Sequence, residues 1–173
     1  VAVDKTGTLT IGKPRVTAVR PVEGVEENAA LFAAAAVETG SAHPLAEAVV
    51  AAARERGWEG DPAQGVEQVV GRGLRGEVDG ERVEVGSLKM FADDPGVGPL
   101  RQVIESLEKE GATAVAVRRG GVYLGAIAMS DEERPEARAA VAELRSMGVR
   151  RVVMLTGDNE HVAAAMAARL GID

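Results

Sequence analysis

The chain has 173 residues, of which 46% are hydrophobic and only 2% aromatic, and its formal net charge is −7. This charge argues against a surface for nucleic acid or anionic membrane, since both partners require positive potential. The sequence has no cysteine and only two histidines, His43 and His161, which excludes disulfides, thiolate zinc sites and histidine-rich metal sites.

The first predicted element is a short apolar strand over residues 1–3, which ends at Asp4. Continuous apolar runs of this kind are typical of parallel strands that helices cover on both faces. The polar segment Asp4–Thr8 is then a loop at the carboxyl end of the strand, where open α/β sheets bind their ligands. Alternation over residues 15–22 predicts a further strand.

The middle of the chain combines helices with strands of period two. Asp79-Gly80 separates two alternating runs and indicates a β-hairpin turn. The expected helices cover residues 26–38, 44–56 and 100–110, and the expected strands lie within 66–86 and over 113–117 and 122–129. Pro44 suits the first turn of its helix, where its missing N–H has no helical partner.

The last part of the chain returns to the pattern of the first. A helix is expected over residues 134–147, a buried strand over 152–155 and a helix over 161–170. The sequence therefore predicts a partial Rossmann-like α/β domain with an inserted α+β domain, an antiparallel sheet flanked by helices. The α/β domain is expected to comprise residues 1–19 and 127–173, and the inserted domain residues 20–126.

The segment Asp4–Thr10, of sequence DKTGTLT, carries the strongest chemical signal. A carboxylate at a sheet edge can attack a γ-phosphate and form an acyl phosphate. Because both groups are anionic, the attack needs Mg²⁺ and a nearby lysine such as Lys5. Gly7 permits a close turn around the phosphate, and the Thr6 hydroxyl can hydrogen-bond its oxygens. The plain alternative is an ordinary polar turn after a strand.

This string is the phosphorylation signature of P-type ATPases, and the chain resembles the heavy-metal-transporting members of that family, within the haloacid dehalogenase-like superfamily. The resemblance implies that ATP phosphorylates Asp4, with Lys5 and Thr6 beside it and Mg²⁺ held at Asp4 and Thr6. Related phosphatases usually carry an aspartate in the place of Thr6, which acts as general acid and base. A threonine cannot do so, which implies a longer-lived aspartyl phosphate.

A second match follows the other buried strand. In Thr156-Gly157-Asp158-Asn159, the Thr156 hydroxyl and the Gly157 backbone could hold phosphate oxygens, and Asp158 would face the Mg²⁺–nucleotide. The alternative is a helix N-cap at Asp158 or Asn159. Asp131, followed by the segment 134–137, matches the family's return to the phosphorylation domain, and a helix N-cap is again the alternative.

A third match lies in the inserted domain. The segment 41–45, Ser-Ala-His-Pro-Leu, is similar to the adenine-binding segment of heavy-metal P-type ATPases. The resemblance implies that His43 contacts adenine, together with Glu38 and the glycines Gly71 and Gly73. A histidine before proline is otherwise a common helix start, and His161 is expected to be a helix-surface residue.

The family pattern continues with a lysine and a Gly-Asp-Gly-x-Asn-Asp segment, and neither occurs before Asp173. The chain also opens inside the strand-like run 1–3 and stops just after the helix-like run 161–170, so both of its ends resemble cuts within a longer protein. The resemblance implies a heavy-metal-exporting ATPase whose membrane and actuator domains are the partners of this segment, on the cytoplasmic side of the membrane. It also implies that the transported cation binds elsewhere, and the sequence slightly favours zinc, cadmium, lead or cobalt over copper.

Two other functions remain open at this point. One is a stand-alone phosphatase of the same fold, which Thr6 disfavours. The other is a non-catalytic ATP-binding module, for which Glu38, His43, Gly71 and Gly73 would suffice. For the chain by itself, the missing segments predict weak nucleotide binding and poor turnover.

Overall fold

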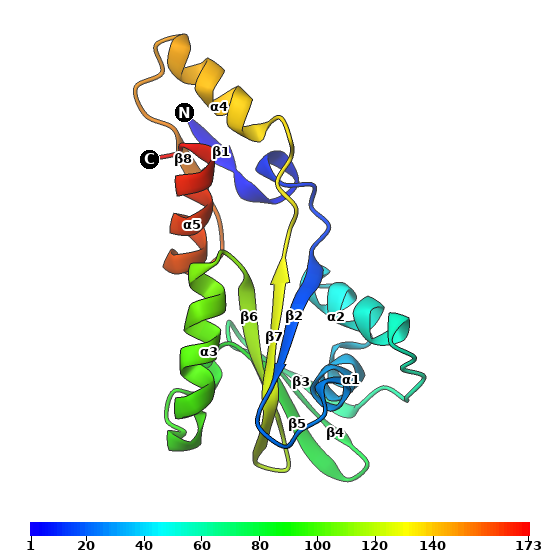
Figure 1. Cartoon of the computed structure of the whole chain (residues 1–173). Coiled ribbons are helices and arrows are strands. Elements are labelled where there is room, and N and C mark those ends of the chain that lie inside the picture. The colour runs from blue at the N-terminus through cyan, green and yellow to red at the C-terminus, as the bar shows by residue number, and fades with distance from the viewer.

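The computed structural model describes all residues, 1–173, and shows two lobes joined by two adjacent connecting segments (Figure 1). The upper lobe holds a parallel pair of strands, β1 (Ala2–Asp4) and β8 (Val153–Leu155), with helices α4 (Ala137–Ser146) and α5 (Glu160–Leu170). The first and the last strand of the chain therefore pair with each other in this small sheet.

The lower lobe contains a six-stranded antiparallel sheet with strand order β2-β7-β6-β5-β4-β3. Its strands are β2 (Arg15–Pro21), β3 (Gln64–Val69), β4 (Gly73–Val78), β5 (Glu81–Gly86), β6 (Thr113–Arg119) and β7 (Val122–Ser130). Its helices are α1 (Glu27–Glu38), α2 (Pro44–Glu55) and α3 (Gly98–Lys109), with short 3-10 turns at Leu88–Phe91 and Pro95–Val97. The predicted fold class is therefore confirmed.

The two faces of the large sheet differ in side-chain size because neighbouring residues of a strand point to opposite faces. On β7, Ile127 and Met129 belong to the buried cluster formed with α1 and α2, whereas Ala126 and Ala128 belong to the cluster under α3. Alanine-rich α1 covers the face with large side chains. The leucines and isoleucine of α3 cover the alanine face. At both helix–sheet interfaces, large side chains on one surface therefore pack against small side chains on the other.

The hairpin predicted at Asp79-Gly80 joins β4 to β5. Both turn residues have positive φ, 52° at Asp79 and 76° at Gly80. That combination defines the two-residue turn whose twist matches the flanking strands, and aspartate followed by glycine adopts it readily. The local sequence signal was therefore sufficient at this turn.

Two details differ from the sequence-based expectations. The helix expected from residue 134 begins at Ala137, because Pro135 disfavours a helical backbone at Arg134 and the Arg134 N–H donates to the Leu9 carbonyl at 2.9 Å. The expected domain limits at 20 and 126 fall inside β2 and β7, which both lie wholly in the large sheet. The division that follows the sheets passes instead through the connecting segments, 11–14 and 131–136.

A third buried cluster belongs to the upper lobe and is smaller than the core of the large sheet. It consists of Leu9, Ala137, Val141, Val152, Met166, Leu170 and Ile172. Each of the three clusters lies within one lobe, so no apolar core spans both. The longest helices have 12 residues, about 18 Å, and none is long and apolar enough to cross a bilayer.

Candidate active site

Asp4 ends β1 with an exposed side chain and pairs in register with Leu155, the last residue of β8. Because the two strands are parallel, the loops that follow them lie at the same edge of the sheet, where α/β folds bind ligands. No hydrogen bond engages the Asp4 carboxylate in the structure, so both of its oxygens are available. The candidate nucleophile is therefore accessible and not enclosed in a core.

The loop after Asp4 is shaped from within by Thr10. Gly7 has φ +78°, a conformation that favours glycine, and its N–H donates to the Thr10 Oγ1 at 3.3 Å. Thr10 is completely buried, and its own N–H donates to the Lys5 carbonyl at 3.1 Å. The last residue of the DKTGTLT string thus supports the backbone beside the nucleophile, a role that the sequence alone did not assign.

The ammonium of Lys5 pairs with the carboxylate of Asp158, which joins the two predicted motifs directly. The side chains are 11% and 18% exposed, so the pair is largely shielded from water. The Thr156 hydroxyl lies 3.0 Å from the Asp158 Oδ2 and also accepts the Asp158 N–H at 3.1 Å. In this state the charge of Lys5 is compensated by Asp158, whereas the sequence predicted that it would face phosphate.

The remaining residues of these motifs lie at the surface of the same edge. Thr6 and Gly157 are exposed, and the Thr6 side chain makes no hydrogen bond. Asn159 is the N-cap of α5, since its Oδ1 accepts the Val162 N–H at 3.0 Å. The N-cap alternative for this segment is therefore correct at Asn159, while Asp158 is engaged by Lys5.

Asp131 does not cap a helix, and this alternative from the sequence is wrong. Its carboxylate accepts the Thr10 hydroxyl and the backbone N–H groups of Gly12, at 3.0 Å, and Lys13, at 2.9 Å. Asp131 therefore joins one connecting segment to the other, next to the loop that follows Asp4. On the upper side, the Arg134 guanidinium donates to the Gly7 carbonyl at 3.1 Å. Both contacts join residues more than 100 positions apart, beyond the reach of local patterns.

His43 caps helix α2, and its side chain also remains accessible to a ligand. Its Nδ1 accepts the Leu45 N–H at 3.2 Å and so caps α2, and the side chain is exposed. In the neutral ring the proton is then on Nε2, which leaves a donor free. Glu38, at the end of α1, is mostly buried, and desolvation raises the pKa of its carboxyl to about 7.

Gly71 and Gly73 lie at the turn between β3 and β4, and the two positions differ in whether a side chain would fit there. A Cβ at Gly73 would lie 2.1 Å from the Val85 carbonyl oxygen, so the pairing of β4 with β5 itself demands glycine there. A Cβ at Gly71 would meet nothing within 4 Å, although its φ is +67°. No hydrogen bond connects this turn with Glu38 or His43, so the adenine site stays a prediction.

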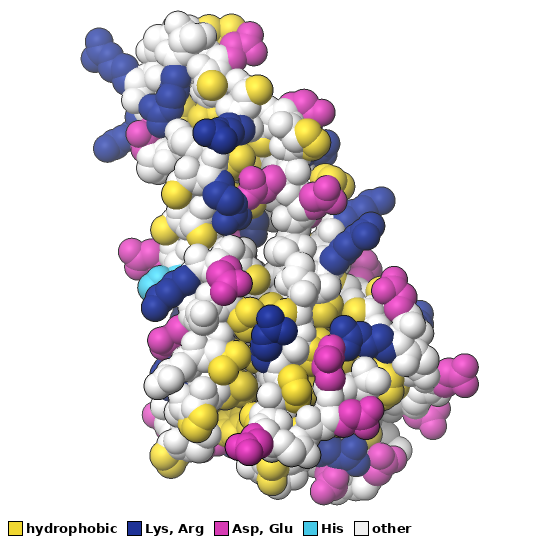
Figure 2. Space-filling model, in the orientation of Figure 1, with side chains coloured by type: hydrophobic (Ala, Val, Ile, Leu, Met, Phe, Trp, Pro, Cys, Tyr) yellow, Lys and Arg dark blue, Asp and Glu magenta, His cyan; other side chains and the backbone are white.

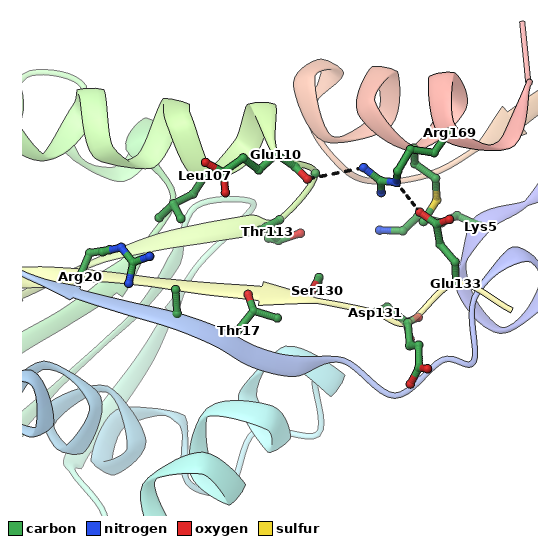
Figure 3. Close-up of a pocket in the computed structure, with 15 residues that line it drawn as sticks. Lys5, Thr17, Arg20, Leu107, Glu110, Thr113, Ser130, Asp131, Glu133 and Arg169 are labelled. Atoms are coloured by element: carbon green, nitrogen blue, oxygen red, sulfur yellow. Dashed lines mark hydrogen bonds and ion pairs between the residues drawn. The ribbon is translucent and has the colours of Figure 1, made fainter. Parts of the chain in front are cut away.

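A cleft of about 490 Å³ lies between the lobes, on the α3 side of the large sheet (Figure 3). Lys5 and Asp131 line it from the upper edge, and Arg20, Thr113 and Ser130 line it from the sheet. Asp4, Glu38 and His43 are not among its lining residues. The cleft therefore reaches Lys5 from the side opposite to α1 and α2. Over the face seen in Figure 2, acidic and basic side chains are interspersed.

The exposed Asp4 ends a parallel strand, and the adjacent Lys5 pairs with Asp158 from the loop after the neighbouring strand. The model of the haloacid dehalogenase-like hydrolases matches residues 1–173, and the chain belongs to this family. More specifically, it is 44% identical over 173 residues to a zinc/cadmium/lead-transporting P-type ATPase of Escherichia coli, and it spans 23% of that protein's length.

Solved structures agree with this relationship. The chain is similar to a zinc-transporting PIB-type ATPase in the E2.Pi state, with a TM-score of 0.71 and 42% identity over 99% of this chain and 28% of that one. It is also similar to the N-domain of a copper-transporting P-type ATPase, with a TM-score of 0.57 and 34% identity over 67% of this chain and 99% of that one. The first of these resembles the whole chain, and the second resembles two thirds of it.

Proposed function

We propose that this chain is the ATP-binding and phosphorylation portion of a heavy-metal cation-transporting P-type ATPase. The observation that carries the proposal is the accessible Asp4 carboxylate beside the Lys5–Asp158 pair, at the edge where both motif loops meet. The similarity to zinc- and copper-transporting P-type ATPases supports the class of transported cation. The membrane and actuator parts of such a pump would be the partners of this segment.

In the proposed reaction, a carboxylate oxygen of Asp4 attacks the γ-phosphorus of ATP. The bond between that phosphorus and the bridging oxygen breaks, ADP leaves with that oxygen, and an aspartyl phosphate remains. In this proposal Lys5 turns from Asp158 to the incoming phosphate, and the Thr156 hydroxyl and the Gly157 N–H donate hydrogen bonds to its oxygens. Since Thr6 offers no proton-transferring carboxylate, later hydrolysis is slow without help from another domain.

We propose that the loop after Asp4 holds a magnesium ion that is bound together with nucleotide. No group of three or more acidic or histidine side chains gathers there, and the Asp4 carboxylate has no protein partner. Mg²⁺ at phosphate sites takes one or two carboxylates and keeps its waters. Asp4 and the carbonyl group of Thr6 would hold it, and when bound it supplies charge neutralisation on the transferred phosphate.

We assign adenine binding to Glu38, His43 and the Gly71–Gly73 turn of the lower lobe. The free Nε2 of His43 and the exposed ring permit stacking and hydrogen bonding, and the glycine turn permits close backbone approach. Because the chain has only two histidines, the test has a matched control. Titration with a non-hydrolysable ATP analogue should show at least tenfold weaker binding for His43→Ala and unchanged binding for His161→Ala. Equal affinity in both variants would contradict the adenine assignment.

The phosphate acceptor is tested separately with γ-labelled ATP and Mg²⁺. A small acid-stable, hydroxylamine-labile signal is expected in the unmodified chain and none in Asp4→Asn. Asp61→Asn, in an exposed loop, serves as the control and should keep the signal. Label that survives in Asp4→Asn would exclude Asp4 as the acceptor. Steady hydrolysis of p-nitrophenyl phosphate would instead favour a stand-alone phosphatase.

A further inference from the structure

The two lobes have few means of holding a fixed angle. Each buried cluster lies within one lobe, and only the two connecting segments cross between lobes. These segments pair through the Ile11 N–H to the Glu132 carbonyl and the Arg134 N–H to the Leu9 carbonyl, both at 2.9 Å. A two-stranded ribbon of this kind can bend and twist, so a contact away from its axis is needed to set the tilt.

Arg169 on α5 provides such a contact. Its Nε donates to the Glu133 Oε1 at 2.6 Å, and its Nη1 lies 3.5 Å from the Glu110 carbonyl oxygen (Figure 3). Arg169 belongs to the upper lobe, Glu133 to a connecting segment, and Glu110 to the end of α3 in the lower lobe. One guanidinium therefore touches all three parts of the molecule.

The end of α3 is built to receive this side chain. The final carbonyls of a helix carry partial negative charge and lack helical partners, so a guanidinium is favourable there. Gly111 has φ +93°, and a Cβ at this position would lie 2.8 Å from the Arg169 Nη1. One turn earlier, Glu108 faces Asn159 and His161 at the start of α5, and burial raises the pKa of its carboxyl. In Figure 1, α3 and α5 lie end to end along one side of the molecule.

We propose that Arg169 is a positioning residue, which holds the lower lobe at a set tilt relative to Asp4 through Glu133 and the end of α3. The inference rests on the proposed function, since the γ-phosphate of a nucleotide bound to the lower lobe must reach Asp4 in the upper one. The side chains of Arg169 and Glu133 are 45% and 28% exposed. An ion pair this accessible changes an equilibrium only about two- to fivefold, which suits a contact that must open and close repeatedly.

The distance between the lobes tests this proposal directly. The chain has no cysteine, so spin labels can be placed at Ala51→Cys on α2 and Ala142→Cys on α4, both exposed positions. Without nucleotide, the labelled chain should give a narrow distance distribution. Arg169→Ala should broaden or shift it, Glu133→Gln should do so to a smaller extent, and Arg138→Ala on α4 should not. An Arg169→Ala distribution identical to that of Arg138→Ala would overturn the proposal.

Salt separates an ion-pair contact from a general loss of packing. Raising the salt concentration should broaden the distribution of the unmodified chain toward that of Arg169→Ala, and it should have little effect on the variant itself. The urea midpoints of the two chains should stay close, because the pair is half exposed. A salt effect of equal size in both chains would count against Arg169.

Nucleotide binding distinguishes failure of this inference from failure of the proposed function. The adenine contacts lie within one lobe, so the affinity for the ATP analogue should be unchanged in Arg169→Ala while the distance distribution changes. If neither chain binds the analogue, the proposed function fails, and the nucleotide-free distances still decide whether Arg169 sets the tilt. If Arg169→Ala loses both its affinity and its urea midpoint, Arg169 is a stability residue and the proposal fails.

Discussion

The two lobes differ in how chemistry and stability are distributed. The upper lobe carries the candidate nucleophile and both candidate phosphate-binding motifs on a two-stranded sheet, with a core of seven buried residues and with Leu155 57% exposed. The lower lobe carries candidate adenine-binding residues that are spread over several elements. These elements are supported by a six-stranded sheet with buried clusters of 14 and 10 residues on its two faces. The lobe with the clearer sequence motifs thus has the smaller sheet and the smaller buried core.

This contrast shows that a segment with a clear sequence motif does not need a large sheet or core around it. The loop after Asp4, the candidate phosphate-binding loop, is fixed by a few hydrogen bonds that involve Thr10, Asp131 and Arg134, which need little surrounding core. A candidate adenine surface spread over two helices and a turn needs a large rigid sheet to keep its parts in place. The predictions below address this contrast, from the largest expected effect to the smallest.

The largest effect is expected from Ile127→Ala in the centre of the lower lobe. Ile127 is completely buried against α1, so truncation should lower the free energy of unfolding by about 3–4 kcal/mol. Because the cores are separate, hydrogen exchange should accelerate in β5, β6 and β7 and change little in β1 and β8. Equal acceleration in both lobes would show that they unfold as one unit, and the contrast would fail.

The second effect concerns the two candidate adenine glycines. Gly73→Ala should cost about 3 kcal/mol, because its Cβ would overlap the Val85 carbonyl and separate β4 from β5. Gly71→Ala should cost only about 1 kcal/mol, the strain of an alanine at φ +67°. Urea denaturation measures both values. Similar losses would mean that the β3–β4 turn has another constraint at Gly71.

The third effect follows from Glu38. Burial raises the pKa of its carboxyl from 4.5 to about 7, so the folded state favours the neutral acid. That stabilisation is complete below pH 4.5 and is lost as the pH rises through about 7. Glu38→Gln should therefore raise the free energy of unfolding by about 1–3 kcal/mol at pH 8 and have little effect at pH 4.

The control for this experiment is Glu47→Gln, at an exposed position on α2, which should give the same pH profile as the unmodified chain. If Glu38 accepts a hydrogen bond from adenine, the stabilised Glu38→Gln variant should also bind the ATP analogue more weakly. A gain in stability at pH 4 equal to that at pH 8 would show that burial of charge is not the cause.

The last prediction concerns the connection between the lobes. Asp131→Ala removes the acceptor of the Thr10 hydroxyl and of two backbone N–H groups, and it should cost about 1–2 kcal/mol. The loss is moderate because water can reach the Lys13 N–H. Asp131→Asn should recover part of it, since the amide oxygen still accepts. Thermal unfolding measures both variants, and no loss in Asp131→Ala would mean that these contacts are dispensable.

Most of the fold could be predicted from local patterns. The alternation of β2 to β7, the Asp79-Gly80 turn and the apolar runs at β1 and β8 each identify their element because they depend on neighbouring residues. Asp4, at the end of a short apolar strand, could likewise be expected at the sheet edge, although β1 itself is more exposed than the apolar run predicts. Pro135 was a usable signal for the late start of α4, since it restricts the residue before it.

The contacts that complete the site could not be predicted in this way. Lys5 pairs with Asp158, 153 positions away, and Asp131 binds Thr10 across 121 positions. No local period encodes such pairings, because they exist only once the parallel strands and the connecting segments are in place. The same limit explains why sequence patterns predict domain boundaries inside β2 and β7, since the pairing of these two strands is not visible in either strand alone.

Thr10 belongs at the same time to the candidate phosphate-binding loop and to the junction between the lobes. Its oxygen receives the Gly7 N–H from above and its hydroxyl reaches the Asp131 carboxylate below. Thr10 therefore links the backbone next to the candidate nucleophile to the junction, alongside the Arg134 contact to the Gly7 carbonyl. A change in the angle between the lobes that displaced Asp131 would thus reach the candidate phosphate-binding loop through Thr10, a linkage that the DKTGTLT string itself contains.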